Sequence, residues 1–200
     1  VKIFDEVYGN PSSVHHLGIA AKNIINDARV KVAKAIGCKP GEIIFTSGGT
    51  EANNIACRSF GSVAYCTDLE HSSVLANCCE LRVPTHSDGT LDVNRFKSRL
   101  VSDYYKDIKN AVFSIMSANN ETGVVLDPSH ALKELKEKFG FILHVDAVAS
   151  FGKGDCNPES LGADLMTISG HKIHALKGVG ALYISERISN KAKPILLGGG

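Results

Sequence analysis

Short apolar runs that alternate with helical segments most constrain the fold of this 200-residue chain. Six of these runs are rich in apolar and β-branched residues and have the length of buried strands. Strands that are apolar throughout are typical of a sheet covered on both faces. The pattern predicts an α/β fold with a mostly parallel central sheet flanked by helices. The predicted strands are 42–46, 62–67, 111–116, 141–146, 165–169 and 180–184.

Apolar residues at helical spacing lie between several of these strands. The first helical segment begins at Pro11 and the serines after it, and Gly37 can close its last turn. A chain of this length can bury a sizeable core, so we expect residues 1–200 to form one domain. The predicted helices are 11–37, a helix entered from the Gly-rich turn 47–54, a helix start within 71–78, and 129–140, while 101–110 is the most polar connector.

Composition argues against several classes of partner. The formal net charge is +1, so no strong field points to nucleic acid or to an anionic membrane. No apolar run is long enough to span a bilayer, and the opening VKIFDEVYGN lacks the regions of a secretory signal. The six cysteines show no CxxC pair, so we interpret them as reduced thiols in a cytosol-like compartment. They are Cys38, Cys57, Cys66, Cys78, Cys79 and Cys156.

Both ends of the sequence are abrupt. The chain opens without a clear start signal and closes on the Gly-rich run LLGGG. A Gly-rich run at a terminus more often leads into further structure than ends a fold. We therefore expect these residues to be part of a longer polypeptide.

Polar residues follow most of the predicted strands. Ligands of such sheets bind at the carboxyl ends of the strands, so we expect the segments after the strands to lie in one neighbourhood. Residues able to bind or react occur in all of these segments except the loop after Ile184, and this clustering predicts a functional site. The segments are 47–50, 67–71, 117–120, 146–149, 169–172 and the loop after Ile184.

The stretch TSGGTE brings glycines to the start of a helix. Glycines such as Gly49 let backbone N–H groups approach an anion, the helix dipole favours negative charge, and the Thr50 hydroxyl can add a hydrogen bond. The pattern is neither a Walker A loop nor a dinucleotide-binding GxGxxG. A bare tight turn with a helix cap is an equally good interpretation of these residues.

Three titratable residues follow other strands. Asp146 ends an apolar strand, where a carboxylate needs a partner such as a protonated pyridine nitrogen; capping the next helix is the common alternative. Lys172 is flanked by Ser169 and His171, which could bind phosphate, although a lysine here is more often structural or exposed. His71 could stack on a flat cofactor or move a proton, although a core or capping role is more common.

Together these residues supply an anion cradle, an acid for a ring nitrogen, an amine nucleophile and a stacking imidazole. Pyridoxal phosphate needs these four parts. Two other chemistries fit less well. His171 and His174 lack a carboxylate or cysteine that would complete a metal site, and the chain has no GxSxG elbow of a serine hydrolase.

Six stretches that cover nearly all of the chain carry a family resemblance. They are YGNPSSVHHLG, IIFTSGGTEANN, LEHSSV, SANNETGVV, HVDAVASFGK and DLMTISGHKIHALKGVGALYI. In their order and spacing the chain resembles the cysteine desulfurase and selenocysteine lyase family, in the class V aminotransferase group of fold-type-I pyridoxal-phosphate enzymes. The resemblance implies that residues 1–200 are the large cofactor-binding domain, as in aspartate aminotransferase.

The resemblance implies a role for each matching residue. Lys172 would form a Schiff base with the cofactor, and Asp146 would pair with its pyridine nitrogen. His71 would stack on the ring and take part in proton transfer. The phosphate would be held by Gly49, Thr50, Ser169 and His171, and Asn119 would lie near the ring oxygen and the substrate.

The implied enzyme is a pyridoxal-phosphate-dependent cysteine desulfurase, a transferase of iron–sulfur cluster assembly and sulfur transfer. It would convert L-cysteine to L-alanine and hold the sulfur as an enzyme-bound persulfide. The resemblance further implies a homodimer and a sulfur-acceptor protein. It would act in the cytoplasm, or in the mitochondrion of a eukaryote.

The sequence departs from the family in three respects. Ala149 stands where the family usually has a glutamine that donates to the ring hydroxyl. The family's opening segment is absent. So is the part with the smaller domain, the arginine for the substrate carboxylate and the loop with the sulfur-accepting cysteine. Cofactor binding is thus better supported than activity of these residues alone.

Two alternatives stay open at this point. One is a selenocysteine lyase, acting on L-selenocysteine, or another class V aminotransferase-like enzyme. The other is a truncated, non-catalytic protein that serves as a sulfur-transfer partner or binding module. The short length and Ala149 favour the second slightly.

Overall fold

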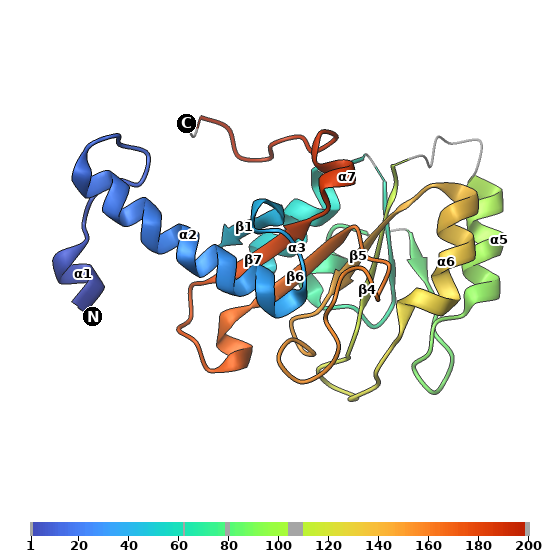
Figure 1. Cartoon of the computed structure of the whole chain (residues 1–200). Helices are drawn as coiled ribbons and strands as arrows, with labels where there is room; N and C mark the ends of the chain where they lie inside the picture. Colours follow the sequence, from blue (N-terminus) through green and yellow to red (C-terminus); the bar gives the residue numbers. More distant parts are fainter. Residues whose placement is uncertain (1, 62, 79–80, 104–109, 199–200) are drawn as a thin grey trace. The chain divides into compact units, whose positions relative to one another are not determined.

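The computed structural model describes residues 2–61, 63–78, 81–103 and 110–198 (Figure 1). Contacts divide the chain into two compact units, residues 1–43 and 44–200. The first unit contains the helices α1 (Lys2–Glu6) and α2 (His16–Ile36) and the 3₁₀ turn η1 (Pro40–Glu42). The second contains nearly all of the sheet and its flanking helices.

Helix α2 begins five residues later than the sequence predicts. The oxygens of Asn10 accept hydrogen bonds from the backbone N–H groups of Ser12 and Ser13, which closes a turn where the helix was expected to start. His15 then caps α2 through its side chain. Gly37 ends the helix as predicted, with a φ of 75° that favours glycine.

The central sheet has seven strands in the order β1-β7-β6-β5-β4-β2-β3. Strands β3, β2, β4, β5 and β6 pair in parallel, and β6 and β7 pair antiparallel. The predicted mostly parallel sheet is therefore confirmed. The strands are β1 (Ile43–Thr46), β2 (Ala64–Thr67), β3 (Arg82–Val83), β4 (Val112–Met116), β5 (Ile142–Asp146), β6 (Leu165–Ser169) and β7 (Gly180–Ile184).

All six predicted strands are present, although Ser62, the first residue predicted for β2, lies outside the described residues. The two-residue strand β3 was not predicted. One expectation is wrong: the loop after Ile184 does not share the neighbourhood of the other strand ends. Ile184 pairs with Leu165, at the start of β6, because β7 runs antiparallel. The ten-residue connection 170–179 is shorter than a parallel crossover needs.

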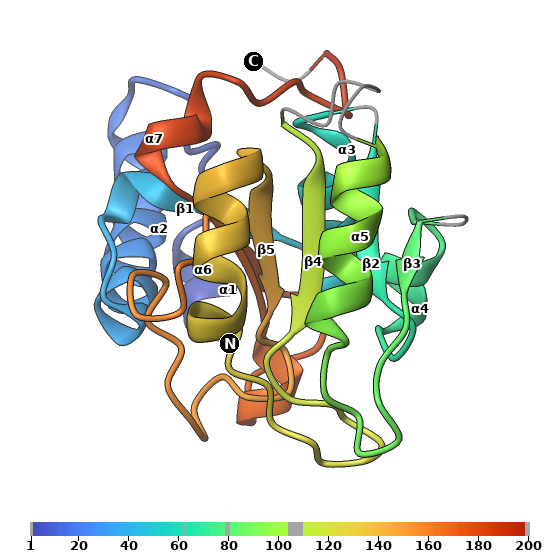
Figure 2. The same ribbon diagram turned by 90° about the vertical axis from the view of Figure 1, so that its right-hand side faces the viewer.

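Helices cover both faces of the sheet. In Figure 2, α5 and α6 lie side by side in front of β4 and β5, and α3 lies behind the sheet. Helix α5 was not predicted, and the expected connector 101–110 contains its last turn; residues 104–109 lie outside the described residues. The helices of this unit are α3 (Gly49–Arg58), α4 (Ser72–Leu75), α5 (Val93–Asp103), α6 (Pro128–Phe139) and α7 (Glu186–Ser189), with the 3₁₀ turn η3 (Gly170–Ile173).

Aromatic rings fill the space between α5 and the sheet. Phe96 of α5 is fully buried and stacks on Phe113 of β4 with ring centroids 4.1 Å apart. Tyr65 and Phe141 meet the Phe96 ring edge to face, at 6.2 and 5.6 Å. Helix α5 is therefore held by one central ring that contacts three strands or strand ends.

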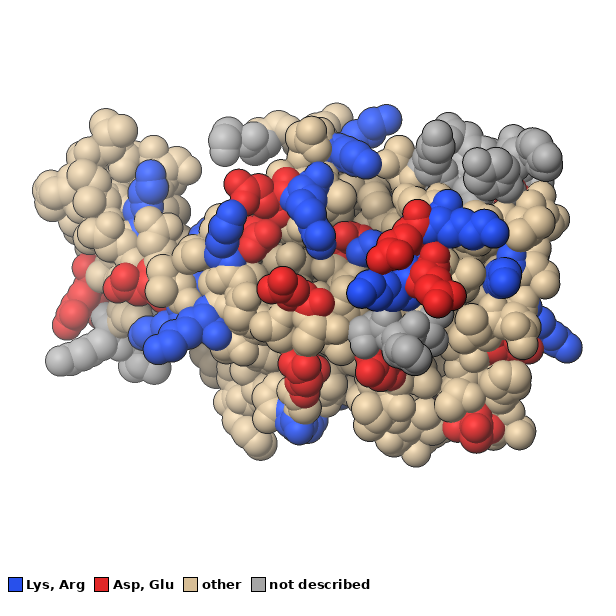
Figure 3. Space-filling view, turned by 45° about the vertical axis from the view of Figure 1, so that its right-hand side comes forward, with Lys and Arg blue, Asp and Glu red and all other residues tan. Residues whose placement is uncertain are grey.

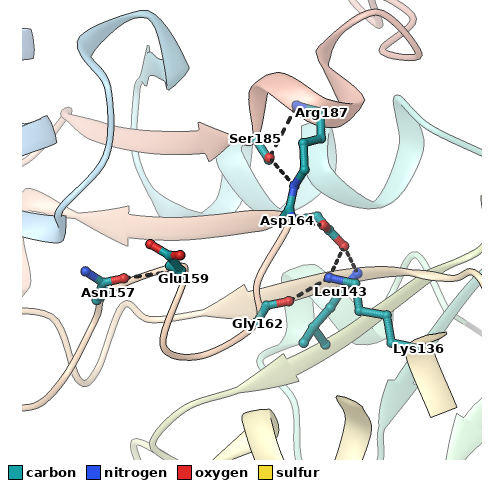
Figure 4. Close-up of polar contacts among 8 residues, drawn as sticks. All are labelled: Lys136, Leu143, Asn157, Glu159, Gly162, Asp164, Ser185 and Arg187. Atoms are coloured by element: carbon teal, nitrogen blue, oxygen red, sulfur yellow. Dashed lines mark hydrogen bonds and ion pairs between the residues drawn. The ribbon is translucent and has the colours of Figure 1, made fainter. Parts of the chain in front are cut away.

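A polar cluster closes the edge of the sheet where β5 and β6 begin (Figure 4). The buried carboxylate of Asp164 lies 2.6 Å from Lys136 Nζ of α6 and accepts the backbone N–H of Leu143 at 3.0 Å. Arg187 of α7 approaches the other carboxylate oxygen at 3.7 Å. These contacts tie two helices to the amino ends of the strands and leave the carboxyl ends open for a site.

The surface carries charges of both signs. On the face displayed in Figure 3, Lys and Arg side chains are interspersed with Asp and Glu, and neither sign covers an extended area. Within the described part of the chain, no helix combines the length and apolar character needed to cross a membrane.

Truncating the central ring of α5 should destabilise the second unit. Phe96→Ala removes a fully buried ring that touches three other rings, and we expect a loss of about 3–5 kcal/mol in unfolding free energy, measured by urea denaturation. Val101→Ala on the same helix is the control: this side chain is 53% exposed, so a change within about 0.5 kcal/mol is expected. Equal losses in both variants would contradict the packing described.

Candidate cofactor site

A cavity of about 180 Å³ lies at the carboxyl ends of β1, β2, β4, β5 and β6. Six of the eight predicted site residues line it; Ser169 and Asn119 do not. Parallel strands thus bring together residues that are more than 120 positions apart in sequence. The lining residues are Gly49, Thr50, Asn53, His71, Met116, Ala118, Asn120, Asp146, Val148, Ala149, His171 and Lys172.

Asp146 is the most buried charged group of the site, with 4% of its surface exposed. Its Oδ1 accepts the backbone N–H of Val148 at 3.0 Å, and its Oδ2 accepts Asn53 Nδ2 at 2.8 Å. Burial raises the pKa of this carboxyl group, while these two hydrogen bonds and nearby His71 oppose the rise. Neither donor carries a charge, so a cation in the cavity would stabilise the carboxylate strongly.

A chain of hydrogen bonds joins Asp146 to His71. Asn53 Nδ2 also donates to Ser73 Oγ at 2.9 Å, and Ser73 Oγ lies 2.8 Å from His71 Nδ1. The backbone N–H of Ser73 donates to the same ring nitrogen at 3.2 Å, which makes His71 the N-cap of α4. Because Nδ1 accepts this bond, the proton of the neutral ring lies on Nε2.

His71 therefore has the capping role that is common for a lone histidine, and it also lines the cavity. The cap fixes the ring through Nδ1 and leaves Nε2 without a partner in that contact. His71 thus presents one oriented nitrogen to the cavity side of the turn.

The first turn of α3 supplies backbone N–H groups. Its N-cap, Gly48, makes no side-chain capping bond, and Gly49 and Thr50 line the cavity. A Cβ on Gly49 would lie 3.0 Å from Val148 Cγ2, and a Cβ on Gly180 would lie 2.8 Å from the backbone of Gly48. Glycines therefore let the turn after β1 pack against its neighbours, with the positive end of α3 facing the cavity.

Lys172 and His171 lie on η3, directly after β6, and both are exposed. Ser169, the last residue of β6, is buried, and its Oγ lies 2.8 Å from His171 Nδ1. Ser169 thus orients His171 without lining the cavity itself. Lys172 lines the cavity and follows β6, the strand next to β5, which ends at Asp146.

The side chain of Asn119 forms hydrogen bonds with backbone groups. Its Nδ2 donates to the carbonyl of Leu69 at 3.0 Å, and its Oδ1 accepts the N–H groups of Glu121 and Thr122, each at 2.8 Å. The neighbouring Asn120 lines the cavity instead. The predicted role of Asn119 near a ring oxygen stays a prediction.

These residues fit pyridoxal phosphate. Asp146 is a buried carboxylate whose two donors, Asn53 Nδ2 and the Val148 N–H, are uncharged, which suits a pyridinium nitrogen as a further partner. An uncapped helix start suits a phosphate, and Lys172 brings an amine. Asn53 Oδ1 is buried and, among the described residues, has no hydrogen-bond partner. Ala149 lines the cavity with a methyl group that donates no hydrogen bond.

Sequence reasoning missed Asn53 and Ser73, which connect the predicted residues. Both lie inside motifs that gave the prediction, TEANN and HSSV, so their position beside predicted site residues is the signal that could have found them. Their partners, Asp146 and each other, come from other strand ends, and only the folded topology reveals those contacts.

The mostly parallel seven-strand sheet with its flanking helices is the fold of the fold-type-I NifS-like proteins. The chain belongs to the aminotransferase class-V family, whose model matches residues 1–200.

Several relatives are named cysteine desulfurases. The cysteine desulfurase IscS of Dictyoglomus turgidum is 39% identical over 209 residues, covering 97% of this chain and 51% of that protein. A solved NifS-like protein from Rickettsia africae matches with a TM-score of 0.90 at 32% identity, covering 100% of this chain and 56% of that one. SspA in complex with cysteine matches at 0.82 and 27% identity, covering 99% and 59%. The chain spans about half the length of the curated relatives it matches.

Replacing the buried carboxylate should change how stability depends on pH. The folded-state pKa of Asp146 lies above its ordinary value of 3.8, so its contribution to stability is present below that pH and lost as the pH rises through the folded-state pKa. In the cofactor-free protein, the stability of Asp146→Asn relative to the wild type should therefore rise as the pH increases from 3.8 through the folded-state pKa. Urea unfolding at a series of pH values measures this.

The matched control is Asp88→Asn, because Asp88 is exposed and hydrogen bonds from Thr90 lower its pKa. This variant should show no such gain. If Asp146→Asn keeps the pH dependence of the wild type, the carboxyl group is not buried as described.

Proposed function

We propose that this chain is the large cofactor-binding domain of a pyridoxal-phosphate-dependent cysteine desulfurase, spanning residues 1–200. The observation that carries the proposal is the shared cavity. It joins a lysine on η3, a buried carboxylate at the end of β5 and the uncapped start of α3. The names of the relatives and the cysteine bound in one structural neighbour support this choice of reaction.

Each residue has a task that follows from its surroundings. Lys172 would hold the cofactor covalently through its amine, with the phosphate at Gly49, Thr50 and His171, the latter oriented by Ser169. Asp146 would hold a proton at the ring nitrogen by electrostatic pairing. When bound, pyridoxal phosphate supplies an electron sink for the bonds at the Cα of an amino acid.

His71 would donate or accept a proton beside the reacting atoms. Because Ser73 occupies Nδ1, His71 can give up or accept a proton only at Nε2 without breaking its cap. A cap that fixes the ring lowers the orientational cost of such a transfer.

The overall reaction would transfer the sulfur of L-cysteine to a protein thiol. The carbon–sulfur bond of the substrate breaks, a sulfur–sulfur bond forms on the acceptor cysteine, and a proton replaces sulfur on carbon to give L-alanine. Cys57, Cys66, Cys78 and Cys156 are buried, so none of these four thiols suits the role of acceptor, and we infer that the acceptor cysteine lies elsewhere in a longer polypeptide.

The same reasoning extends to partners. We infer an amino-acid substrate, L-cysteine or L-selenocysteine, a homodimer and an acceptor protein for the sulfur. The five cysteines of the described residues are free thiols, which supports a reducing compartment such as the cytoplasm.

Removing the amine of η3 should abolish covalent cofactor binding. After incubation with pyridoxal phosphate and removal of the excess, the protein should show a visible absorbance band, and Lys172→Ala should lose it almost completely. Lys177→Ala, a nearby exposed lysine outside the cavity wall, should keep the band. A full band in Lys172→Ala would contradict the role of Lys172. Absence of alanine formation from cysteine in a longer polypeptide that contains these residues and the acceptor cysteine, and that does show the band, would contradict the proposed reaction alone.

A further inference from the structure

Glu70 directly precedes His71, and none of the roles above uses it. Only 5% of its surface is exposed. Its Oε1 accepts the hydroxyl of Thr67 at 2.7 Å and the backbone N–H of Met116 at 2.9 Å. Its Oε2 is buried and, within the described part of the chain, has no hydrogen-bond partner. Burying a carboxyl group with one oxygen that lacks a hydrogen-bond partner costs free energy and calls for an explanation.

The contacts of Glu70 tie two strand ends together. Thr67 is the last residue of β2, and Met116 is the last residue of β4. One carboxyl oxygen therefore links the turn that leads to His71 with the end of the neighbouring strand. The carbonyl of Leu69, one residue earlier, accepts Asn119 Nδ2 from the segment after β4.

The turn that carries His71 is thus held from one side by Glu70 and Asn119 and from the other by Ser73. We propose that Glu70 is a positioning residue whose Oε1 holds the turn 68–71 against β4 and thereby sets where the His71 ring lies in the cofactor site. The consequence for catalysis rests on the proposed function, but the positioning itself does not.

The surroundings of Glu70 favour the protonated form of its carboxyl group. Burial raises the pKa of Glu70 to about 8, although the bonds from Thr67 and Met116 oppose the rise. The titratable groups that face it are Asp146 of β5, Cys57 of α3, Cys66 of β2 and Cys78 beyond α4, and Asp146 and Cys78 raise the pKa further.

A neutral carboxyl group keeps Oε1 as the acceptor for both bonds and carries its proton on Oε2. As the pH rises through about 8, ionisation places a second negative charge near Asp146. The bonds from Thr67 and Met116 to Oε1 become charge-assisted and stronger, so the surroundings of the turn should change across that pH.

The test is the NMR signal of His71 in the cofactor-free protein labelled with ¹³C-histidine and assigned with His71→Asn. The wild-type signal should show an inflection near pH 8 that reports Glu70, here called the second inflection. Glu70→Gln keeps the Oε1 acceptor and cannot ionise, so the second inflection should be absent while the signal at pH 7 stays in place. Glu70→Ala should shift or broaden the signal at pH 7.

Asp68→Asn is the matched control. Asp68 lies in the same turn, but its carboxylate accepts Thr85 Oγ1 at an exposed position, so the His71 signal should not change. Should Glu70→Ala fail to fold, Thr67→Val removes one of the two bonds to Oε1 and should give a smaller shift of the same kind. An unchanged His71 signal in the folded variants would overturn the proposal.

A second readout separates this proposal from the proposed reaction. In alanine formation from cysteine, Glu70→Ala should lower kcat about tenfold or more with little change in KM, and Glu70→Gln should restore most of it at pH 7. Equal loss in both variants would overturn the positioning role. If the wild type forms no alanine, the proposed reaction fails, and the His71 signal alone decides the role of Glu70.

Discussion

The site depends on one unfavourable burial: the carboxylate of Asp146 at the end of the central strand β5. Taken out of water, this group needs donors, and the structure supplies them from Asn53 and the turn after β5. Asn53 also donates to Ser73 Oγ, which contacts the ring of His71, the N-cap of α4. The orientation of the imidazole is thereby linked to a carboxylate on another strand, and a cationic ring nitrogen is the partner that would complete the arrangement.

The parallel strands make this arrangement possible. The carboxyl ends of β2, β4, β5 and β6 and the segments after them contribute side chains to a single cavity, together with the segment after β1. The opposite edge is closed by Asp164, which joins helices to strand starts (Figure 4). The stabilising Asp164 cluster and the cavity therefore lie at opposite ends of the strands. Glu70 is a buried group beside the cavity that also has a structural role, because it holds the turn of His71 against β4.

Much of this could be predicted from the sequence, for identifiable reasons. Continuous apolar runs gave the strands, and residues directly after them gave Asp146, His71 and Lys172. The direction of β7 could not be read from its apolar pattern, which is the same for either direction, although the short connection before it carried a signal. Asn53 and Glu70 are polar residues whose burial depends on partners far away in sequence. Such contacts follow from topology and not from local pattern.

The central claim is that this edge of the sheet holds pyridoxal phosphate on Lys172. The most direct measurement is borohydride reduction of the cofactor-treated protein followed by peptide mass spectrometry of every lysine. The account predicts a pyridoxyl-phosphate group on the peptide that contains Lys172 and little on other lysines. Modification spread over exposed lysines, or concentrated on a peptide from another part of the chain, would contradict it.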